Sequence, residues 1–413
     1  MILSKIRKSQ NIPAQYGGNR HDCCVKLHGL FQPFGGCTMD SLGWTSAQAA
    51  DATGYPGLLT IDLGALRRNY EQLCALAAPA EVAAVVKANA YGLGVAPVAR
   101  TLLAAGCRQF FVAQLGEALA LRPLLPEAAR LYVLNGLLPG TASIFAAHNL
   151  IPVLNAPEQL EAWQAQARAC GRRLPAILQF DTGMSRFGVA PRARASFRAA
   201  LAAAPEIEAL YVMSHLASAD EPDAAQNASQ RAEMLKITAE FAPLPVCFGN
   251  SGGVLMGADF HGALVRPGIA LYGGAPHAGR VGPMAPVVGL SLSVAQIREV
   301  PEGALIGYSA TYRAAAPMRL AVLAAGYADG LPRALSGRGA AYYGGIRLPM
   351  VGRLSMDSLI VDITHLPEGA LAPGDLVEMI GPHQSLEQLA ADAGTISYEI
   401  LTSLGQRYRR VYL

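Results

Sequence analysis

The chain has 413 residues, of which 52% are hydrophobic and 15% are charged, and its formal net charge at pH 7 is +3. Such a composition supports a sizeable buried core and excludes a disordered chain or a solvated coiled coil. The charge is too weak and too scattered to indicate a nucleic acid or a membrane surface as partner, so a small-molecule substrate is expected. The length predicts one large domain of barrel or doubly wound type and a smaller one.

No stretch reaches the roughly 18 consecutive apolar residues of a membrane span, and the N-terminal residues lack the apolar core of a signal peptide. A cytoplasmic location is therefore expected. Seven cysteines form an odd set without a CxxC pair. This set fits reduced thiols better than a disulfide framework or a zinc site, so no metal is expected.

Residues 1–57 show no sustained hydrophobic period and contain two Gly-Gly pairs and adjacent cysteines. They are expected to form a poorly ordered N-terminal extension. Within them, the run Met39–Leu42 repeats the four residues Met-Asp-Ser-Leu found at Met356–Leu359. We interpret this match as coincidence, with translation from Met39 as the alternative, because one shared tetrapeptide does not make a structural repeat.

From residue 58 to residue 285, short apolar runs alternate with helical patterns such as 156–170 and 223–241, which are bounded by Gly or Pro. Eight strands alternating with helices predict a (β/α)8 barrel, in which functional groups lie at the carboxyl ends of the strands. The predicted strands are Val82–Val86, Gln109–Ala113, Leu131–Leu134, Ile151–Leu154, Ala176–Phe180, Ala209–Ser214, Val246–Phe248 and Ala263–Arg266.

After residue 285 the pattern changes to strand-like runs such as LSLSVAQIREV and LIVDI, separated by turns and without intervening helices. Residues 286–413 are therefore expected to form a smaller, mostly β domain. One short helix is expected around Leu386–Ala393, followed by a strand-rich tail.

The first predicted barrel strand ends at Lys87, where a barrel places its functional groups. A lysine that emerges from an apolar strand is partly desolvated, which lowers its pKa and makes the amine available as a Schiff-base nucleophile or a base. Position alone slightly favours an ordinary lysine whose amine extends to solvent.

The seventh strand continues into Asn250-Ser251-Gly252-Gly253, and the eighth continues into Arg266-Pro267-Gly268-Ile269. The loops after these two strands are the usual phosphate site of this barrel, and a serine hydroxyl with glycine-flanked N–H groups offers suitable donors. The pattern indicates a phosphorylated ligand, with ordinary tight turns as the alternative.

Nine short motifs in order, at compatible spacings across residues 58–413, make the sequence resemble the alanine racemase family, whose members are fold-type III enzymes that use pyridoxal 5'-phosphate (PLP). The motifs are VVKANAYGLG, DTGMSRFGV, SHLASAD, NSGG, RPGIALYG, IGYSATY, GYADG, GRLSMD and SYEIL.

The resemblance implies that Lys87 binds PLP and acts as the base on one face of the substrate. It implies that Tyr308 serves the opposite face and is contributed by the partner subunit of a head-to-tail homodimer. Such a pair suits racemisation, because removing a proton on one side and returning it on the other inverts the centre.

The resemblance also assigns Arg266 to the pyridine nitrogen of PLP. A guanidinium keeps its own proton, so the ring nitrogen stays unprotonated and the cofactor is a weaker electron sink, which favours racemisation over transamination. The other residues matched to cofactor binding are Tyr91, His215, Asn250, Ser251, Gly268, Ile269 and Tyr398.

On the substrate side, Arg186 matches an arginine that contacts the substrate carboxylate, a role suited to its planar fork of donors. Met356 is matched through its backbone N–H, Asp357 lies beside it, and Tyr327 lines a narrow entrance. One departure is Gln179, which stands where many members carry a carbamylated lysine, so dependence on a carbamate is not expected.

The resemblance therefore implies an isomerase that interconverts L-alanine and D-alanine and supplies D-alanine for peptidoglycan. A broader amino-acid racemase is the main alternative. A PLP-carrying regulatory protein is less favoured, because such proteins usually lack the second domain. A fold-type III decarboxylase would more typically place an acidic residue where this sequence has Arg266.

Overall fold

The computed structural model describes residues 52–413. Most of the expected N-terminal extension, including the alternative start at Met39, lies outside the described residues. Cys74, Cys107, Cys170 and Cys247, the cysteines within the described range, are free thiols, as the sequence predicts. None of the helices described between residues 52 and 413 combines the length and the apolar character that crossing a membrane requires.

Within residues 52–413, nine parallel strands form the barrel sheet in the order β2-β10-β9-β8-β7-β6-β5-β4-β3. The strands are β2 (Glu81–Val82), β3 (Ala84–Val85), β4 (Gln109–Val112), β5 (Arg130–Val133), β6 (Ile151–Leu154), β7 (Leu174–Gln179), β8 (Ile207–Met213), β9 (Val246–Asn250) and β10 (Leu264–Arg266). The helices around and between them are α2 (Leu63–Ala77), α3 (Lys87–Tyr91), α4 (Val95–Ala104), α5 (Leu115–Leu121), α6 (Ala142–Ala147), α7 (Pro157–Cys170), α8 (Arg194–Ala202), α9 (Ala225–Glu240) and α10 (Ser251–Met256).

The segment 81–86 joins the two ends of the barrel sheet. The Ala83 N–H donates to the Val265 carbonyl on one side, and the Val86 N–H donates to the Phe111 carbonyl on the other, both over 2.9 Å. The single strand predicted over Val82–Val86 is therefore split into β2 and β3, each bonded to a different neighbour. The predicted (β/α)8 barrel followed by a smaller, mostly β domain is confirmed.

The second sheet has the order β16-β15-β18-β11-β1-β19, with β14 joining β11 to β17. Its strands are β1 (Gly57–Ile61), β11 (Val288–Val300), β14 (Met318–Leu323), β15 (Ala340–Tyr343), β16 (Ile346–Pro349), β17 (Leu359–Asp362), β18 (Leu376–Ile380) and β19 (Arg409–Tyr412). A short ribbon of β12 (Leu305–Ile306) and β13 (Tyr312–Arg313), and the helices α11 (Leu386–Asp392) and α12 (Ser397–Ser403), complete this part.

Two features of this part differ from the sequence prediction. The barrel was expected to begin at residue 58, yet β1 pairs with β11 and β19 of the second sheet. An apolar run that is buried along its whole length fits either sheet, so periodicity alone does not decide between them. The tail was also expected to be rich in strands, whereas it contains α12, whose buried residues Ser397, Ile400 and Leu401 follow the i, i+3, i+4 spacing of a helix rather than the alternation of a strand.

One hydrophobic core extends from the barrel into the second sheet. Polar contacts connect the same regions: the Asn69 amide on α2 donates to the Ala285 carbonyl over 2.8 Å, and its oxygen accepts from the Ala285 N–H over 2.8 Å. The Tyr412 hydroxyl donates to the Leu93 carbonyl over 2.9 Å. The carboxyl ends of the barrel strands therefore have a fixed position relative to α12 and the C-terminal strand.

Candidate active site

Lys87 lies at the carboxyl end of the segment that contains β3, where its position after an apolar strand predicts it. The backbone of residues 88–91 then runs left-handed, with φ between 53° and 55°. Residues other than glycine avoid this region at a cost of about 1–2 kcal/mol each, so neighbouring contacts have to hold the turn. Within the turn, the Ala90 N–H donates to the Val86 carbonyl over 2.9 Å.

The carboxylate of Glu117 on α5 is hydrogen-bonded to this turn. It accepts hydrogen bonds from the backbone N–H groups of Ala88 (2.5 Å), Ala113 (2.8 Å) and Gln114 (3.0 Å). The last of these contacts belongs to the capping box that begins α5. Glu117 therefore connects the start of a helix to the residue that follows Lys87, and fixes where the lysine leaves the strand.

The electrostatic environment of Lys87 makes its amine easier to deprotonate. Burial lowers the pKa of Lys87, and the nearby charges of Arg186 and Arg266 lower it further, whereas the Glu117 carboxylate opposes them. Desolvation and like charge both disfavour the ammonium form. The neutral, nucleophilic amine is therefore present at lower pH than in an ordinary lysine.

Arg266 ends β10 as a buried arginine that its surroundings hold in place. Its guanidinium donates to the carbonyls of Ser214 (2.8 Å) and Phe248 (3.2 Å) and lies 3.3 Å from Nδ1 of His215. Burial and the charge of Arg266 lower the pKa of His215 well below its usual range. His215 is therefore neutral, and its Nδ1 accepts the hydrogen bond from the arginine.

The loops after β9 and β10 meet at Ser251. Its Oγ accepts hydrogen bonds from the N–H groups of Gly268 (2.9 Å) and Ala270 (3.3 Å). Asn250 caps α10 by accepting from the Gly253 N–H over 2.9 Å. Because α10 and the 3-10 helix Ile269–Tyr272 both begin here, N–H groups that lack an acceptor within their helix are concentrated at one place, which suits an anion.

Tyr91 and Tyr398 add hydroxyl groups to this anion cradle. Their ring centroids are 6.0 Å apart, and a side-chain carbon placed on Gly268 would collide with the Tyr91 hydroxyl. Burial raises the pKa of Tyr91, and burial together with Asp220 raises the pKa of Tyr398 to about 12. Both hydroxyls therefore stay protonated near neutral pH and act as hydrogen-bond donors.

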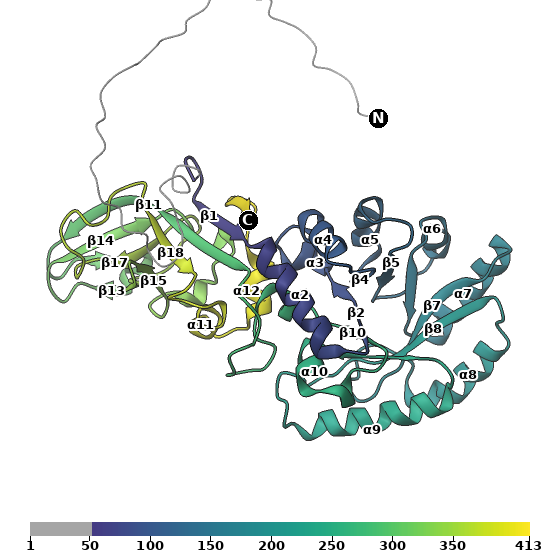
Figure 1. The fold of residues 1–413 in the computed structure, drawn as a ribbon. Helices are drawn as coiled ribbons and strands as arrows, with labels where there is room; N and C mark the ends of the chain where they lie inside the picture. The colour runs from purple at the N-terminus through teal and green to yellow at the C-terminus, as the bar shows by residue number, and fades with distance from the viewer. Residues whose placement is uncertain (1–51) are drawn as a thin grey trace, which may run out of the picture. The chain divides into compact units, whose positions relative to one another are not determined.

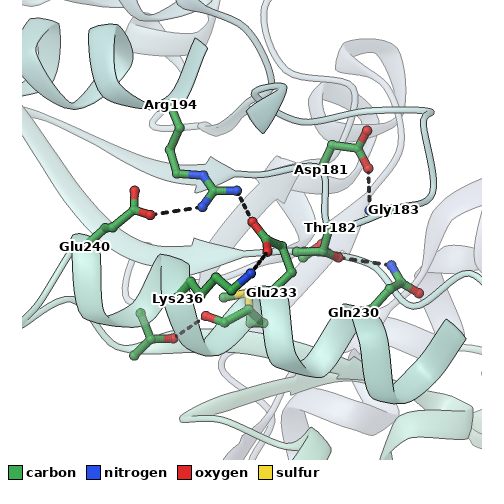
Figure 2. Close-up of polar contacts among 11 residues, drawn as sticks. Asp181, Thr182, Gly183, Arg194, Gln230, Glu233, Lys236 and Glu240 are labelled. Atoms are coloured by element: carbon green, nitrogen blue, oxygen red, sulfur yellow. Dashed lines mark hydrogen bonds and ion pairs between the residues drawn. The ribbon is translucent and has the colours of Figure 1, made fainter. Parts of the chain in front are cut away.

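The loop that carries Arg186 follows β7, and Figure 2 shows the contacts that shape it. Asp181 accepts from the Gly183 N–H over 2.9 Å, and the buried Gln230 amide of α9 donates to the Thr182 hydroxyl over 3.0 Å. The last residue of β7 is the buried Gln179, which supplies a neutral amide at the start of this loop rather than the negative charge of a carbamylated lysine.

Helix α9 is itself held by an ion network with Arg194 of α8. Arg194 bonds to Glu233 and, over 3.0 Å, to Glu240, while Lys236 contacts Glu233 over 3.0 Å (Figure 2). From this fixed helix, Gln230 also donates to the carbonyl of His215 over 2.9 Å. The loops that follow β7 and β8 are therefore both held by Gln230.

The remaining predicted residues lie on the second, mostly β part of the chain. Tyr308 is 70% exposed, Met356 is 52% exposed and Tyr327 is 43% exposed. Tyr308 precedes β13, which Figure 1 shows in the β part, away from α3 and its Lys87. The chain therefore does not bring Tyr308 to its own lysine.

The structure thus divides the predicted site residues into two groups. The first lies around the barrel mouth and comprises Lys87, Tyr91, Arg186, His215, Asn250, Ser251, Arg266, Gly268, Ile269 and Tyr398. The second belongs to the β part and comprises Tyr308, Tyr327, Met356 and Asp357.

Residues 61–276 match the model of the alanine racemase N-terminal domain, and residues 287–412 match that of the C-terminal domain. The chain belongs to the alanine racemase family. A catabolic alanine racemase of Agrobacterium fabrum is 57% identical, with 88% of this chain and 93% of that protein covered. An alanine racemase of Brucella ovis is 50% identical, with 86% of this chain and 93% of that protein covered.

Solved alanine racemases share the fold. The crystal structure from Bartonella henselae, with covalently bound pyridoxal phosphate, has a TM-score of 0.84 at 43% identity, and 87% of this chain and 99% of that chain are covered. The biosynthetic alanine racemase of Pseudomonas aeruginosa has a TM-score of 0.81 at 34% identity, with the same coverage of 87% and 99%. The resemblance carried by the motifs is confirmed, and the chain is an isomerase of the racemase type.

Motifs alone miss several residues that shape the site. Glu117 and Gln230 lie on barrel helices outside the quoted motifs, and Arg407, which forms an ion pair with Asp329, follows the last motif, so no short pattern marks them. Asp329 lies inside GYADG, but neither its residue type nor its spacing shows that it pairs with Arg407. Their roles depend on contacts between segments far apart in sequence.

We expect Glu117→Gln to lower the pKa of Lys87 further, because the substitution removes the carboxylate that opposes the two arginines. The pH dependence of covalent modification at Lys87 by an amine-reactive reagent, followed by peptide mass spectrometry on cofactor-free protein, should move to lower pH. Lys236, which is exposed on α9, provides an internal control that should not move. An unchanged profile at Lys87 would contradict the assigned electrostatic role.

Proposed function

We propose that this chain racemises alanine with PLP as cofactor. The observation that carries the proposal is Lys87, a half-buried amine with lowered pKa at the mouth of the barrel, beside Arg186, Arg266 and an anion cradle. Membership of the alanine racemase family supports the same cofactor, as does the pyridoxal phosphate bound covalently in the Bartonella henselae structure. When bound, PLP draws electrons from the substrate's α-carbon, which makes the α-proton removable.

The residues at the barrel mouth fit this cofactor. The protonated hydroxyls of Tyr91 and Tyr398, the Ser251 hydroxyl and the N–H group of Ile269 are donors suited to a phosphate, while Asn250 and the Gly268 N–H, which donates to Ser251, support the loops. Gly268 leaves room that any side chain would fill. Lys87 would hold the cofactor covalently, as a lysine amine with lowered pKa is suited to do.

Arg266 and His215 would control the electronic character of the bound ring. Arg266 keeps its proton and is fixed by two backbone carbonyls, so it offers a hydrogen bond rather than a proton to a ring nitrogen. His215 is neutral beside it, so its remaining ring N–H can donate a hydrogen bond but is too weak an acid to protonate the cofactor. This environment favours return of a proton to the α-carbon over transamination.

Two residues on opposite faces of the substrate would move the proton. Lys87 serves one face, and Tyr308 of the partner subunit serves the other. Support for the partner's role comes from the exposure of Tyr308 and from its position away from its own Lys87. The assembly proposed is therefore a head-to-tail homodimer, because each exposed tyrosine then reaches the barrel mouth of the other copy.

The substrate carboxylate would be held by Arg186 and by the backbone N–H of Met356, with Asp357 and Tyr327 at the entrance. Met356 and Tyr327 lie on the same part of the chain as Tyr308, so they would reach the same partner site. We propose alanine as the main substrate, because the aromatic ring of Tyr327, which the resemblance places at the entrance, would narrow it.

The cellular role of a racemase depends on which of the two alanine enantiomers other reactions consume. Supply of D-alanine for peptidoglycan in the cytoplasm is the role proposed from the sequence. A catabolic role is the second candidate, because relatives of Agrobacterium fabrum and Rhizobium johnstonii, at 57% and 56% identity, are described as catabolic alanine racemases. The same site serves both, since racemisation runs equally in either direction.

With L-alanine in deuterated water, we expect loss of optical activity together with exchange of the α-proton. Lys87→Ala should abolish both turnover and the visible absorbance of the bound cofactor. Tyr308→Phe should keep the absorbance and lose activity by about 100-fold or more, because one face then lacks its base. Release of CO2, or full activity of Tyr308→Phe, would contradict the proposed reaction or its second base.

Mixed dimers of Lys87→Ala and Tyr308→Phe subunits should regain activity, although either variant alone is inactive. In the mixed dimer, one of the two sites combines an intact lysine with an intact tyrosine from the partner, so the isolated mixed dimer should have about half of the wild-type activity, and a random mixture about a quarter. Co-expression with two affinity tags isolates the mixed species. If Tyr308 acted within its own subunit, no mixed dimer would be active.

Competing rates with alanine, serine, lysine and arginine test the width of the entrance. A narrow entrance predicts that alanine is turned over far faster than lysine or arginine. Tyr327→Ala should reduce this preference, because the substitution removes the aromatic ring at the entrance. Comparable rates for lysine and alanine in the unmodified enzyme would favour a broad amino-acid racemase instead.

A further inference from the structure

The proposed function gives no role to Arg407 and Asp329, which form an ion network with Asp357. Arg407 donates to Asp329 through Nε over 2.6 Å and through Nη2 over 2.8 Å. Its third nitrogen, Nη1, donates to Asp357 over 2.8 Å. Asp329 is fully buried, whereas Asp357 is exposed. One guanidinium therefore bridges a buried and an exposed carboxylate.

The buried carboxylate lies within the turn that carries Tyr327. Asp329 also accepts from the Gly326 N–H over 2.9 Å, so its side chain closes the 3-10 turn Tyr327–Asp329. A buried carboxylate is costly unless it is paired and hydrogen-bonded, and the two-pronged contact with Arg407 meets that condition. The geometry of the Tyr327 turn therefore depends on Arg407.

The exposed carboxylate lies within the loop that carries Met356. The Tyr327 N–H donates to the Ser355 carbonyl and the Ala328 N–H donates to the Met356 carbonyl, each over 3.0 Å. A side-chain carbon on Gly326 would collide with the carbonyls of Ser355 and Met356, so the turn and the loop are in close contact. Arg407 adds a charged connection to this backbone pairing.

The arginine is itself tied to the barrel mouth. The Gly405 N–H donates to the Asp329 carbonyl over 3.0 Å, and Arg410 donates to the carbonyls of Gly405 (3.1 Å) and Gly92 (2.6 Å). This stretch directly follows α12, which carries Tyr398 and packs against α3. Arg407 therefore links the part of the chain beside Lys87 to the turn and loop of the β part.

We propose that Arg407 is a positioning residue that holds the Tyr327 turn and the Met356 loop in one arrangement, and thereby sets the affinity for the substrate carboxylate at the partner's site. The inference rests on the proposed function, in which Tyr327 and the Met356 N–H face the substrate. A guanidinium suits this task because its planar fork engages one carboxylate at two points and leaves a further nitrogen for the second. A lysine ammonium cannot reproduce that geometry.

The test compares Arg407→Lys and Arg407→Gln with the unmodified holoenzyme. We expect KM for L-alanine to rise about tenfold while kcat stays within about twofold, because the displaced groups bind the substrate rather than transfer its proton. The visible absorbance of bound cofactor should not change, because the Arg407 side chain bonds to Asp329 and Asp357 rather than to Lys87. Arg347→Gln, at an exposed arginine on β16 of the second sheet, is the matched control and should leave KM unchanged.

A second comparison keeps the proposal testable if Arg407→Gln fails to fold. In a background of Asp357→Asn, which leaves the buried pair at Asp329 intact, Arg407→Lys should raise KM by a smaller factor than in the unmodified enzyme. A fall in melting temperature with KM unchanged would show a purely structural role and overturn the inference. An unmodified holoenzyme that does not racemise alanine would instead overturn the proposed function.

Discussion

The left-handed turn at residues 88–91 is the constraint on which the barrel mouth depends. It reverses the chain directly after Lys87, at an intrinsic cost of about 1–2 kcal/mol per residue. Backbone hydrogen bonds and the Glu117 carboxylate offset this cost. Because the turn ends at Tyr91, whose hydroxyl lies against Gly268, the lysine and the anion cradle are fixed by the same few residues.

The sequence predicts the part of the site that follows from parallel strands. Lys87, Ser251 and Arg266 follow or end three different barrel strands, and parallel strands bring their carboxyl ends to one rim, so their proximity follows from the strand pattern. Glu117 is different, because its role needs a backbone conformation that residue type does not predict. Assignment of β1 to the second sheet likewise depends on pairing with strands more than 200 residues away.

The second group of site residues was identified through the family resemblance alone. Nothing in the spacing of Tyr308, Tyr327 and Met356 distinguishes them from ordinary surface residues of a β domain. The structure adds that these large side chains are exposed and that the turn and loop carrying Tyr327 and Met356 are tied together through Arg407. An arginine that bonds to two segments of an exposed loop region keeps their relative position fixed. Such support is expected where the region has to keep its shape for a ligand or a partner.

The charges around Lys87 explain why such a site favours anionic ligands. Arg186 and Arg266 both act on the lysine, and Glu117 is the carboxylate that opposes them. Glu117 is already engaged by backbone N–H groups, so it is held in place as a fixed counter-charge. A phosphate in the cradle and a carboxylate beside Arg186 would relieve the remaining repulsion. Binding of such anions should therefore stabilise the folded protein as well as organise the reaction, because a ligand that binds only the native state shifts the folding equilibrium towards it.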